Sequence, residues 1–227
     1  MSPALKPAAP PRLRHRRPAQ RDDHALRQRI VQAARERLFS EGFSALKMED
    51  LATDLGISKK TLYLHFSGKL AISRAALEAF AAEARSDAEQ LLGDTRLTFL
   101  EKLRGFAIGM VERFTRFHQD LLNEIAHHAP SLHRYVDEVR GRNLPYIFGR
   151  FVEAGQLAGM VRDDVSPVFA SEFFLHAVQG MLHPASLKKS KLMPAEIFDQ
   201  SLRIFFGGLL TPEAHEDYEK LFPHRAR

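Results

Sequence analysis

The chain has 227 residues, of which 44% are hydrophobic, so it can bury a substantial core in one large or two small domains. It contains no cysteine, which excludes disulfides, thiolate metal sites and cysteine nucleophiles and fits a reducing cytoplasm. The formal net charge of +5 is unevenly placed: residues 1–23 carry +4, residues 24–70 carry +3 and residues 71–227 carry −2. This asymmetry favours a nucleic-acid partner for the amino-terminal part.

Residues 1–23 are rich in proline and arginine and lack helical periodicity, which predicts a tail that is disordered when free. Arg16-Arg17 is typical of a twin-arginine export signal, but no apolar stretch follows it. The chain has no run of about eighteen apolar residues, so we expect a cytoplasmic protein without a membrane span. Two interpretations of the tail stay open: a solvated segment, or an arm along DNA formed by Arg12, Arg14, Arg16 and Arg17.

A first amphipathic helix is predicted over residues 25–43. Asp22 and Asp23 precede it as possible N-caps, and Gly42 lies where the helical periodicity stops. The apolar stripe that defines the helix consists of Leu26, Ile30, Ala33, Ala34 and Leu38.

The pattern that follows, over residues 48–66, predicts a helix-turn-helix motif. Its first helix runs from Met48 to Leu55 and is stopped by Gly56, and Ser58 is a good N-cap for the second helix. Leu62 and Phe66 can anchor that second helix to a small core. Its remaining side chains can donate hydrogen bonds to phosphates or base edges: Lys59, Lys60, Thr61, Tyr63 and His65.

The string GISKKTLYLHFSGKLAI, together with the helix at residues 25–43, resembles the DNA-binding half of the tetracycline-repressor (TetR) family of bacterial regulators. The resemblance covers about fifty residues and implies an all-α fold. It implies a three-helix helix-turn-helix DNA-binding domain at residues 24–70 and a larger ligand-binding and dimerisation domain at residues 71–227. We therefore expect the chain to bind a double-stranded DNA operator.

The resemblance also implies which residues contact the operator: Lys59, Lys60, Thr61, Tyr63, His65 and Lys69. We expect Lys60 and Thr61 near base edges or adjacent phosphates, and Tyr63, His65 and Lys69 on the sugar-phosphate backbone. The alternative is a solvated charged face. The chain departs from the family at Leu46-Lys47, where Thr or Ser usually caps the first helix of the motif, and Ser44 is then the alternative cap.

Residues 71–227 contain further helical patterns and no strand-like alternation, which predicts about nine helices for the whole chain. A long helix from Lys69 to Leu92 leaves the DNA-binding domain and ends at Gly93-Asp94. An apolar face then runs from Phe99 to Leu121. The remaining expected elements are helices at 121–128, 131–154, 166–182 and 195–210, with a connector at 155–164.

The helices at 166–182 and 195–210 are unusually apolar for a monomer. In the TetR family the corresponding helices pack against their copies in a second subunit, and Gly207-Gly208 would permit a close backbone approach. We therefore expect a homodimer, the alternative being that both helices serve an intramolecular core.

The resemblance further implies a small-molecule effector inside the larger domain. The abundance of Phe and the lack of Trp point to an apolar effector, although ordinary core packing is the alternative for each lining residue. The candidate lining residues are Phe106, Met110, Phe114, Phe117, Tyr146, Phe173 and His176.

Glu124, His127 and His128 share one helix face and are the candidate metal ligands. The pattern occurs once, whereas dimetal sites in helical bundles need two such contributions, so we expect no metal and no other cofactor. The chain lacks a nucleophile elbow, a P-loop and a dinucleotide-binding glycine turn, so we do not expect an enzyme. The sequence thus predicts a homodimeric repressor that binds a palindromic operator and leaves it on binding the effector. A helical metalloprotein or enzyme and a protein-interaction module are the alternatives.

Overall fold

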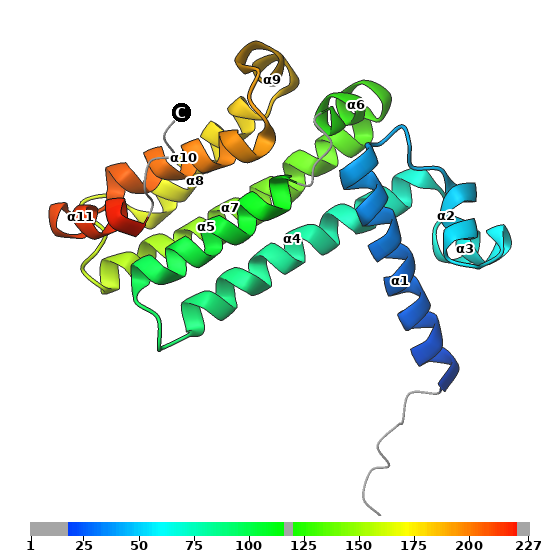
Figure 1. Cartoon of the computed structure of the whole chain (residues 1–227), viewed down its shortest axis with the longest axis horizontal. Helices are drawn as coiled ribbons and strands as arrows, with labels where there is room; N and C mark the ends of the chain where they lie inside the picture. The colour runs from blue at the N-terminus through cyan, green and yellow to red at the C-terminus, as the bar shows by residue number, and fades with distance from the viewer. Residues whose placement is uncertain (1–17, 116–119, 222–227) are drawn as a thin grey trace, which may run out of the picture.

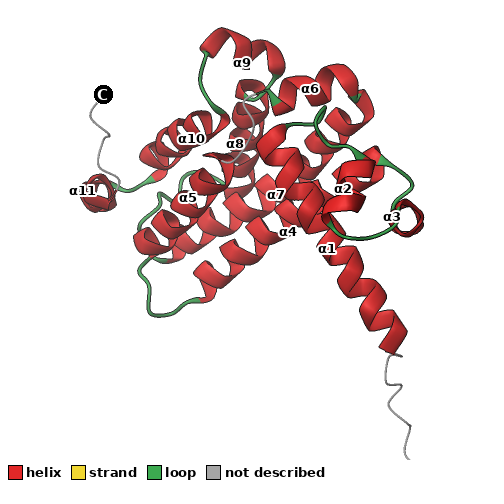
Figure 2. Ribbon diagram, turned by 45° about the vertical axis from the view of Figure 1, so that its right-hand side comes forward, coloured by secondary structure: helices red, strands yellow, loops and turns green. Residues whose placement is uncertain are grey.

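The computed structural model describes residues 18–115 and 120–221, and within these ranges the chain folds into eleven helices (Figures 1 and 2). Val161 and Leu210 form an isolated β-bridge. The described residues contain no β-strand. The expected all-α fold is confirmed. The helices are α1 (Pro18–Glu41), α2 (Met48–Asp54), α3 (Lys59–His65), α4 (Lys69–Gly93), α5 (Phe99–Thr115), α6 (Leu121–His128), α7 (Pro130–Leu157), α8 (Pro167–Met181), α9 (Pro184–Ser190), α10 (Pro194–Leu209) and α11 (Pro212–Leu221).

Three details of the helices differ from the expectations. The described residues contain eleven helices rather than nine, because α9 and α11 are short and each begins at a proline, whose fixed φ suits the first helical position. Helix α1 begins at Pro18, so Asp22 and Asp23 lie inside it rather than capping it. The arginines at residues 12–17, for which a solvated tail and an arm along DNA were both considered, lie outside the described residues.

The third correction concerns the connector expected at residues 155–164, since α7 continues through Gly155 to Leu157. Gly159 adopts φ +69 and its N–H donates to the Gln156 carbonyl at 3.0 Å, while the Met160 N–H donates to the Gly155 carbonyl at 2.9 Å. This pair of hydrogen bonds is a Schellman motif, and it ends α7 with Gly159 supplying the positive φ that the motif requires.

Two hydrophobic cores organise the fold. One lies among α4, α5, α7, α8, α10 and α11, and the other joins α1, α2, α3 and the start of α4 to Leu121, Ile125, Ala129 and Leu132. Phe80 on α4 packs against both cores, with edge-on ring contacts to Phe39 of α1 at 5.3 Å and Phe114 of α5 at 5.9 Å between centroids. Helix α4 therefore links the helix-turn-helix to the bundle of α5, α7, α8 and α10 (Figure 1). None of the described helices is long and apolar enough to cross a membrane.

Gly155 should not tolerate even a methyl group, although it lies inside a helix. A Cβ there would lie 2.3 Å from Val161 Cγ2 and 2.8 Å from Phe99 Cζ, whereas a Cβ at Gly141 of the same helix would meet nothing within 4 Å. We expect Gly155→Ala to lower the free energy of unfolding by about 1–3 kcal/mol through overpacking. The control Gly141→Ala should raise it by up to about 1 kcal/mol through helix propensity. Urea denaturation measures both, and equal effects of the two substitutions would contradict the close contact.

Candidate DNA-binding surface and effector cavity

Helix α3 is held in place by its N-cap and by two apolar anchors. Ser58 has extended φ and ψ angles, and its Oγ accepts a hydrogen bond from the Thr61 N–H at 3.0 Å. Leu62 and Phe66 are buried in the core shared with α1. These contacts turn the opposite face of α3 outward, where Lys59, Lys60 and Tyr63 are exposed.

The two lysines at the start of α3 differ in their surroundings. Lys59 Nζ lies 3.3 Å from Glu49 Oε1 of α2. The pKa of Glu49 lies below its usual value, first because of a hydrogen bond from its own backbone N–H and then because of Lys59. Lys60 is exposed and makes no ion pair with another described residue. Lys60 is therefore the more available of the two cations for an external anion.

Of the other three predicted contacts, Thr61 is half-buried with its Oγ1 2.8 Å from Ser58 Oγ, and His65 and Lys69 face protein groups rather than solvent. The His65 side chain is 9% exposed, and its Nε2 lies 3.7 Å from Asp23 Oδ1 of α1. Lys69 Nζ donates to the Ser44 carbonyl at 3.3 Å and lies 4.2 Å from the centroid of the Phe43 ring. Burial lowers the pKa of Lys69, partly offset by Glu124. In this structure both side chains hold the helix-turn-helix to neighbouring segments.

Helix α2 begins without a side-chain cap. Its N-cap residue is Lys47, and the Ser44 N–H instead donates to Glu124 Oε2 of α6 at 2.9 Å. Ser44 therefore does not cap α2, contrary to one of the alternatives above. Gly42 makes room for the same carboxylate, because a Cβ on Gly42 would lie 2.8 Å from Glu124 Oε2. Glu124 thus ties α6 to the turn between α1 and α2.

The three candidate metal ligands do not converge. Glu124 is engaged by Ser44, and His127 Nδ1 lies 2.8 Å from the Asn123 carbonyl oxygen, while His127 and His128 are exposed. Across residues 18–115 and 120–221 no group of three or more His, Asp or Glu side chains is arranged to hold a metal ion. Glu124 acts here as a structural link between helices.

An internal cavity of about 100 Å³ lies where α4, α5, α6 and α7 meet. Its walls are almost wholly apolar, and they include Phe39 of α1 and both Leu121 and Ile125 of α6. The same three residues belong to or pack in the core of the helix-turn-helix. The cavity therefore directly adjoins the core that supports α3.

Three of the seven predicted effector-site residues, Phe106, Met110 and Phe114, line this cavity. Phe117 lies outside the described residues. The other three lie elsewhere: the Tyr146 hydroxyl donates to Glu89 at 2.6 Å, Phe173 is 58% exposed, and the His176 ring lies 3.9 Å from Glu172 on the surface of α8.

The sequence reasoning missed two polar residues that line the cavity, Arg140 and Asn143 of α7. Arg140 Nη1 donates to Asp137 Oδ1 at 3.4 Å, and Asn143 Nδ2 donates to the Val139 carbonyl at 2.9 Å. A signal was available, because both residues interrupt an apolar stripe at helical spacing. That stripe contains Val136, Val139, Leu144 and Ile147.

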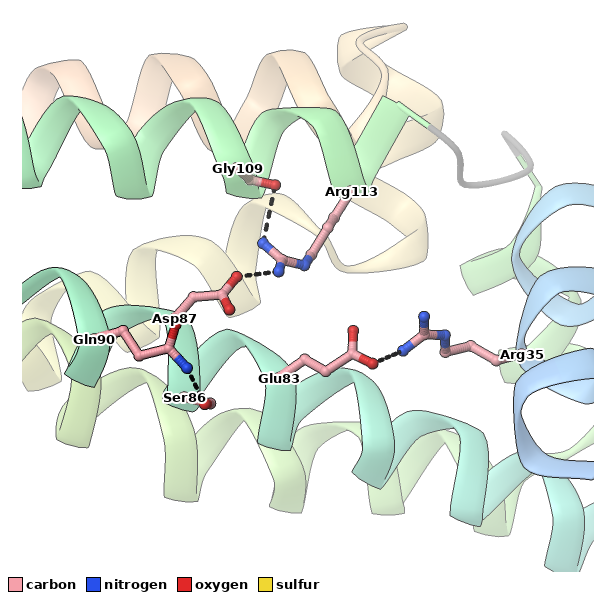
Figure 3. Close-up of polar contacts among 7 residues, drawn as sticks. All are labelled: Arg35, Glu83, Ser86, Asp87, Gln90, Gly109 and Arg113. Carbon is pink, nitrogen blue, oxygen red and sulfur yellow. Dashed lines mark hydrogen bonds and ion pairs between the residues drawn. The ribbon is translucent and has the colours of Figure 1, made fainter. Parts of the chain in front are cut away.

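Ion pairs fix the angles at which α1 and α5 meet α4 (Figure 3). Arg35 of α1 pairs with Glu83 of α4, and Arg113 of α5 pairs with Asp87 of α4 while also donating to the Gly109 carbonyl at 3.2 Å. These pairs flank an open groove between the three helices. Each of the two arginines in the groove already has a carboxylate partner.

The outer faces of α8 and α10 remain apolar and exposed. Ile204 of α10 is 75% exposed, whereas its neighbours Phe205 and Phe206 are buried in the core. A Cβ at Gly207 or Gly208 would meet nothing within 4 Å, so this part of α10 is open. The exposed apolar side chains on the two helices are Val168, Phe169, Phe173, Met181 and Ile204. Four of these five side chains lie on α8, and exposed apolar side chains gathered on one helix are typical of a protein interface.

Comparison with known proteins places the helix-turn-helix within one family. Residues 30–82 match the family described as "Bacterial regulatory proteins, tetR family". The HTH-type transcriptional regulator YvaF of Bacillus subtilis (strain 168) is 23% identical over 185 residues, which cover 78% of this chain and 96% of YvaF. The HTH-type transcriptional repressor DhaR of Mycobacterium sp. (strain GP1) is 24% identical over 192 residues, covering 82% of this chain and 92% of DhaR.

The whole fold also has solved counterparts. SmeT, the repressor of the Stenotrophomonas maltophilia multidrug efflux pump SmeDEF, superposes with a TM-score of 0.57 at 18% identity, covering 85% of this chain and 94% of SmeT. A complex of SmeT with triclosan superposes with a TM-score of 0.59, also at 18% identity, covering 84% of this chain and 94% of that one. The architecture of α1–α11 is thus shared well beyond the matched amino-terminal segment.

The uncapped start of α2 predicts a stabilising substitution. Lys47 already has the extended backbone of an N-cap (φ −112, ψ 136), so Thr at this position can accept a hydrogen bond from the first turn without rearrangement. We expect Lys47→Thr to raise the free energy of unfolding by about 1 kcal/mol in urea denaturation. Lys47→Ala, which removes the same amine but adds no acceptor, is the control. An equal gain in both variants would mean that removal of the lysine, not capping, is responsible.

Proposed function

We propose that this chain, a member of the TetR family of bacterial regulatory proteins, is a homodimeric repressor that leaves its operator when a small molecule fills the cavity between α4, α5, α6 and α7. One observation carries the DNA-binding part. Helix α3 is capped by Ser58 and anchored by Leu62 and Phe66, and it presents Lys59, Lys60 and Tyr63 outward within the segment that matches the family. DhaR, a similar protein, is a repressor, which supports the same direction of regulation here.

We assign DNA binding to residues 24–70, together with the first turns of α1, and effector binding and dimerisation to residues 71–227. Lys60 and Thr61 then lie near the base edges and the adjacent phosphates, and Lys59 and Tyr63 contact the backbone. His65 and Lys69 stabilise the position of the helix-turn-helix, because His65 lies beside Asp23 and Lys69 donates to the Ser44 carbonyl. We assign the protein to the cytoplasm, where its operator lies, and give it no catalytic role.

The apolar faces of α8 and α10 supply the expected dimer interface. A two-fold axis there pairs the same residues of both subunits, so the operator is an inverted repeat. Two recognition helices then enter successive major grooves about 34–36 Å apart. The affinity of the dimer for DNA therefore depends on the distance between its two α3 helices.

Effector binding changes that distance through α6. Leu121 and Ile125 line the cavity and are also buried in the core that supports α3. A molecule that displaces α6 consequently displaces the helix-turn-helix. Its effect on DNA binding equals its differential affinity for the two arrangements. That SmeT has been solved with triclosan supports a small-molecule site in this fold.

The test of DNA binding is selection of genomic fragments by the purified protein at fixed salt, with the bound fragments sequenced. We expect an inverted repeat. Failure to enrich any fragment, even at low salt, would reject the proposal and favour a helix-turn-helix that contacts another protein.

The recovered repeat then tests the exposed face of α3. Lys60→Ala should weaken binding at every salt concentration and lower the slope of log affinity against log salt by about one for each phosphate that the variant no longer neutralises, hence about two for a dimer. Lys188→Ala, which removes an exposed lysine from α9, should leave affinity and slope unchanged. If the wild type and the Lys60 variant bind the operator with equal affinity, Lys60 does not contact DNA.

The dimer interface has its own test in sedimentation equilibrium. Phe173→Glu and Ile204→Glu should each raise the dimer dissociation constant at least a hundredfold, because each places a charge at the centre of an apolar interface. Leu157→Glu is the matched control, since Leu157 is an apolar residue at the end of α7 that is 91% exposed. If the wild type is a monomer, or if all three variants stay dimeric, α8 and α10 do not form the interface.

A further inference from the structure

The cavity between α4, α5, α6 and α7 is apolar except along one side. Twenty-one described residues line it, and among them Arg140 is the one charged residue and Asn143 the one other polar residue. Both lie on α7, separated by three positions, so they share a helix face and are close to each other. The polar groups of the cavity are therefore confined to one place.

Arg140 is poorly paired for a buried cation. Its side chain is 17% exposed, and its one described ion pair is a single 3.4 Å contact to Asp137. Asp137 is shared, because His133 Nδ1 lies 3.5 Å from its other oxygen. By contrast the exposed Arg96 makes two hydrogen bonds to Asp94, at 3.0 and 2.7 Å. A guanidinium carries five donors, so Arg140 retains donor capacity for a planar two-oxygen acceptor.

Asn143 adds hydrogen-bonding capacity beside the guanidinium. The residue is 9% exposed, and its amide makes one described hydrogen bond, to the Val139 carbonyl. The amide therefore keeps a second N–H donor and its own carbonyl acceptor. Buried polar groups are normally satisfied by a partner, and here a ligand would supply that partner.

Arg140 also lies in the wall of an open surface groove between α7, α8 and α9. Arg140 and Leu182 line both the cavity and this groove. The groove contains His133, His176 and His183 but a single carboxylate, Asp137. Its lining therefore does not repel an anion that approaches the guanidinium from solvent.

We propose that the effector is a small organic acid, whose apolar body occupies the cavity and whose carboxylate pairs with Arg140 and accepts a hydrogen bond from Asn143. This inference rests on the proposed function, in which the cavity is the effector site. A neutral effector would bury the guanidinium further and leave it with only the 3.4 Å contact to Asp137, which His133 shares. Burying so weakly paired a charge is costly. Burial already lowers the pKa of Arg140, with Asp137 opposing the shift.

The volume of the cavity adds a constraint on size. An apolar cavity of about 150 Å³ holds one benzene molecule, so an aromatic acid needs more room than the roughly 100 Å³ of the unliganded cavity. Entry of such an acid must push the lining helices apart, and α6 is among them. Binding and displacement of α6 are then the same event.

The test uses the full-length protein and three matched pairs of probes: benzoate and benzamide, phenylacetate and phenylacetamide, hexanoate and hexanamide. Isothermal titration calorimetry should find at least one acid that binds tenfold or more tightly than its amide. Arg140→Gln should weaken that acid at least tenfold and change the affinity of the amide less than threefold. Arg134→Gln, an exposed arginine of the same helix, should change neither affinity.

The proposal is wrong if no acid exceeds its amide tenfold, or if the preference for the acid survives Arg140→Gln in a variant whose circular dichroism is native. Arg140→Lys keeps the charge without the two-point geometry, so its acid affinity should lie between those of the wild type and the Gln variant. If Arg140→Gln does not fold, the proposal is tested by the Arg140→Lys variant and by the affinities of the wild type for the three acid–amide pairs. Binding of the wild type to its operator without any probe tests the proposed function separately. If an amide binds the protein and releases it from DNA as effectively as the matching acid does, the proposed function holds and the proposal of an acidic effector is wrong.

Discussion

The position of the recognition helix depends on one apolar contact, the packing of α6 against the core of α1, α2 and α3. Leu121 and Ile125 are fully buried there, and burying a side chain of this size stabilises a fold by about 1.5–3 kcal/mol. Separating α6 from the helix-turn-helix would cost that free energy for each residue. A ligand that acts on α6 therefore moves the helix-turn-helix along with it. This makes the contact a connection between the cavity and the core that supports α3.

The polar contacts around the packing of α6 contribute less free energy to stability, but they restrict the angles between the helices. The ion pair of Arg35 with Glu83 is partly exposed, and such pairs are worth about 0.2–1 kcal/mol. The hydrogen bond from Ser44 to Glu124 is a single charge-assisted contact, of about 1.5–3 kcal/mol at most. Neither matches the combined burial of Leu121 and Ile125. Their role is to select one angle of α1 against α4 and α6, and a ligand can change that angle without separating the cores.

The sequence predicted well those features that depend on neighbouring residues. The N-cap at Ser58 and the anchors Leu62 and Phe66 lie within nine positions of one another, so their pattern alone indicates α3 and its outward face. The cavity depends instead on how distant helices meet. Phe173 and Phe174 are adjacent and chemically identical, yet one is exposed and the other is in the core. The periodicity of α8 does not indicate which of its two apolar faces packs against α7, so the sequence made Phe173 a candidate for the cavity.

The makeup of the second core also limits how this protein can be divided. Residues 24–70 supply most of that core, but Leu121, Ile125, Ala129 and Leu132 complete it from about fifty residues further along the chain. A fragment that ends with α4 would expose the apolar surfaces of the core that these four side chains cover. A chimaera that grafts this helix-turn-helix onto another sensor must therefore carry α6 and the start of α7 with it. The unit that can be exchanged between such regulators is discontinuous in sequence.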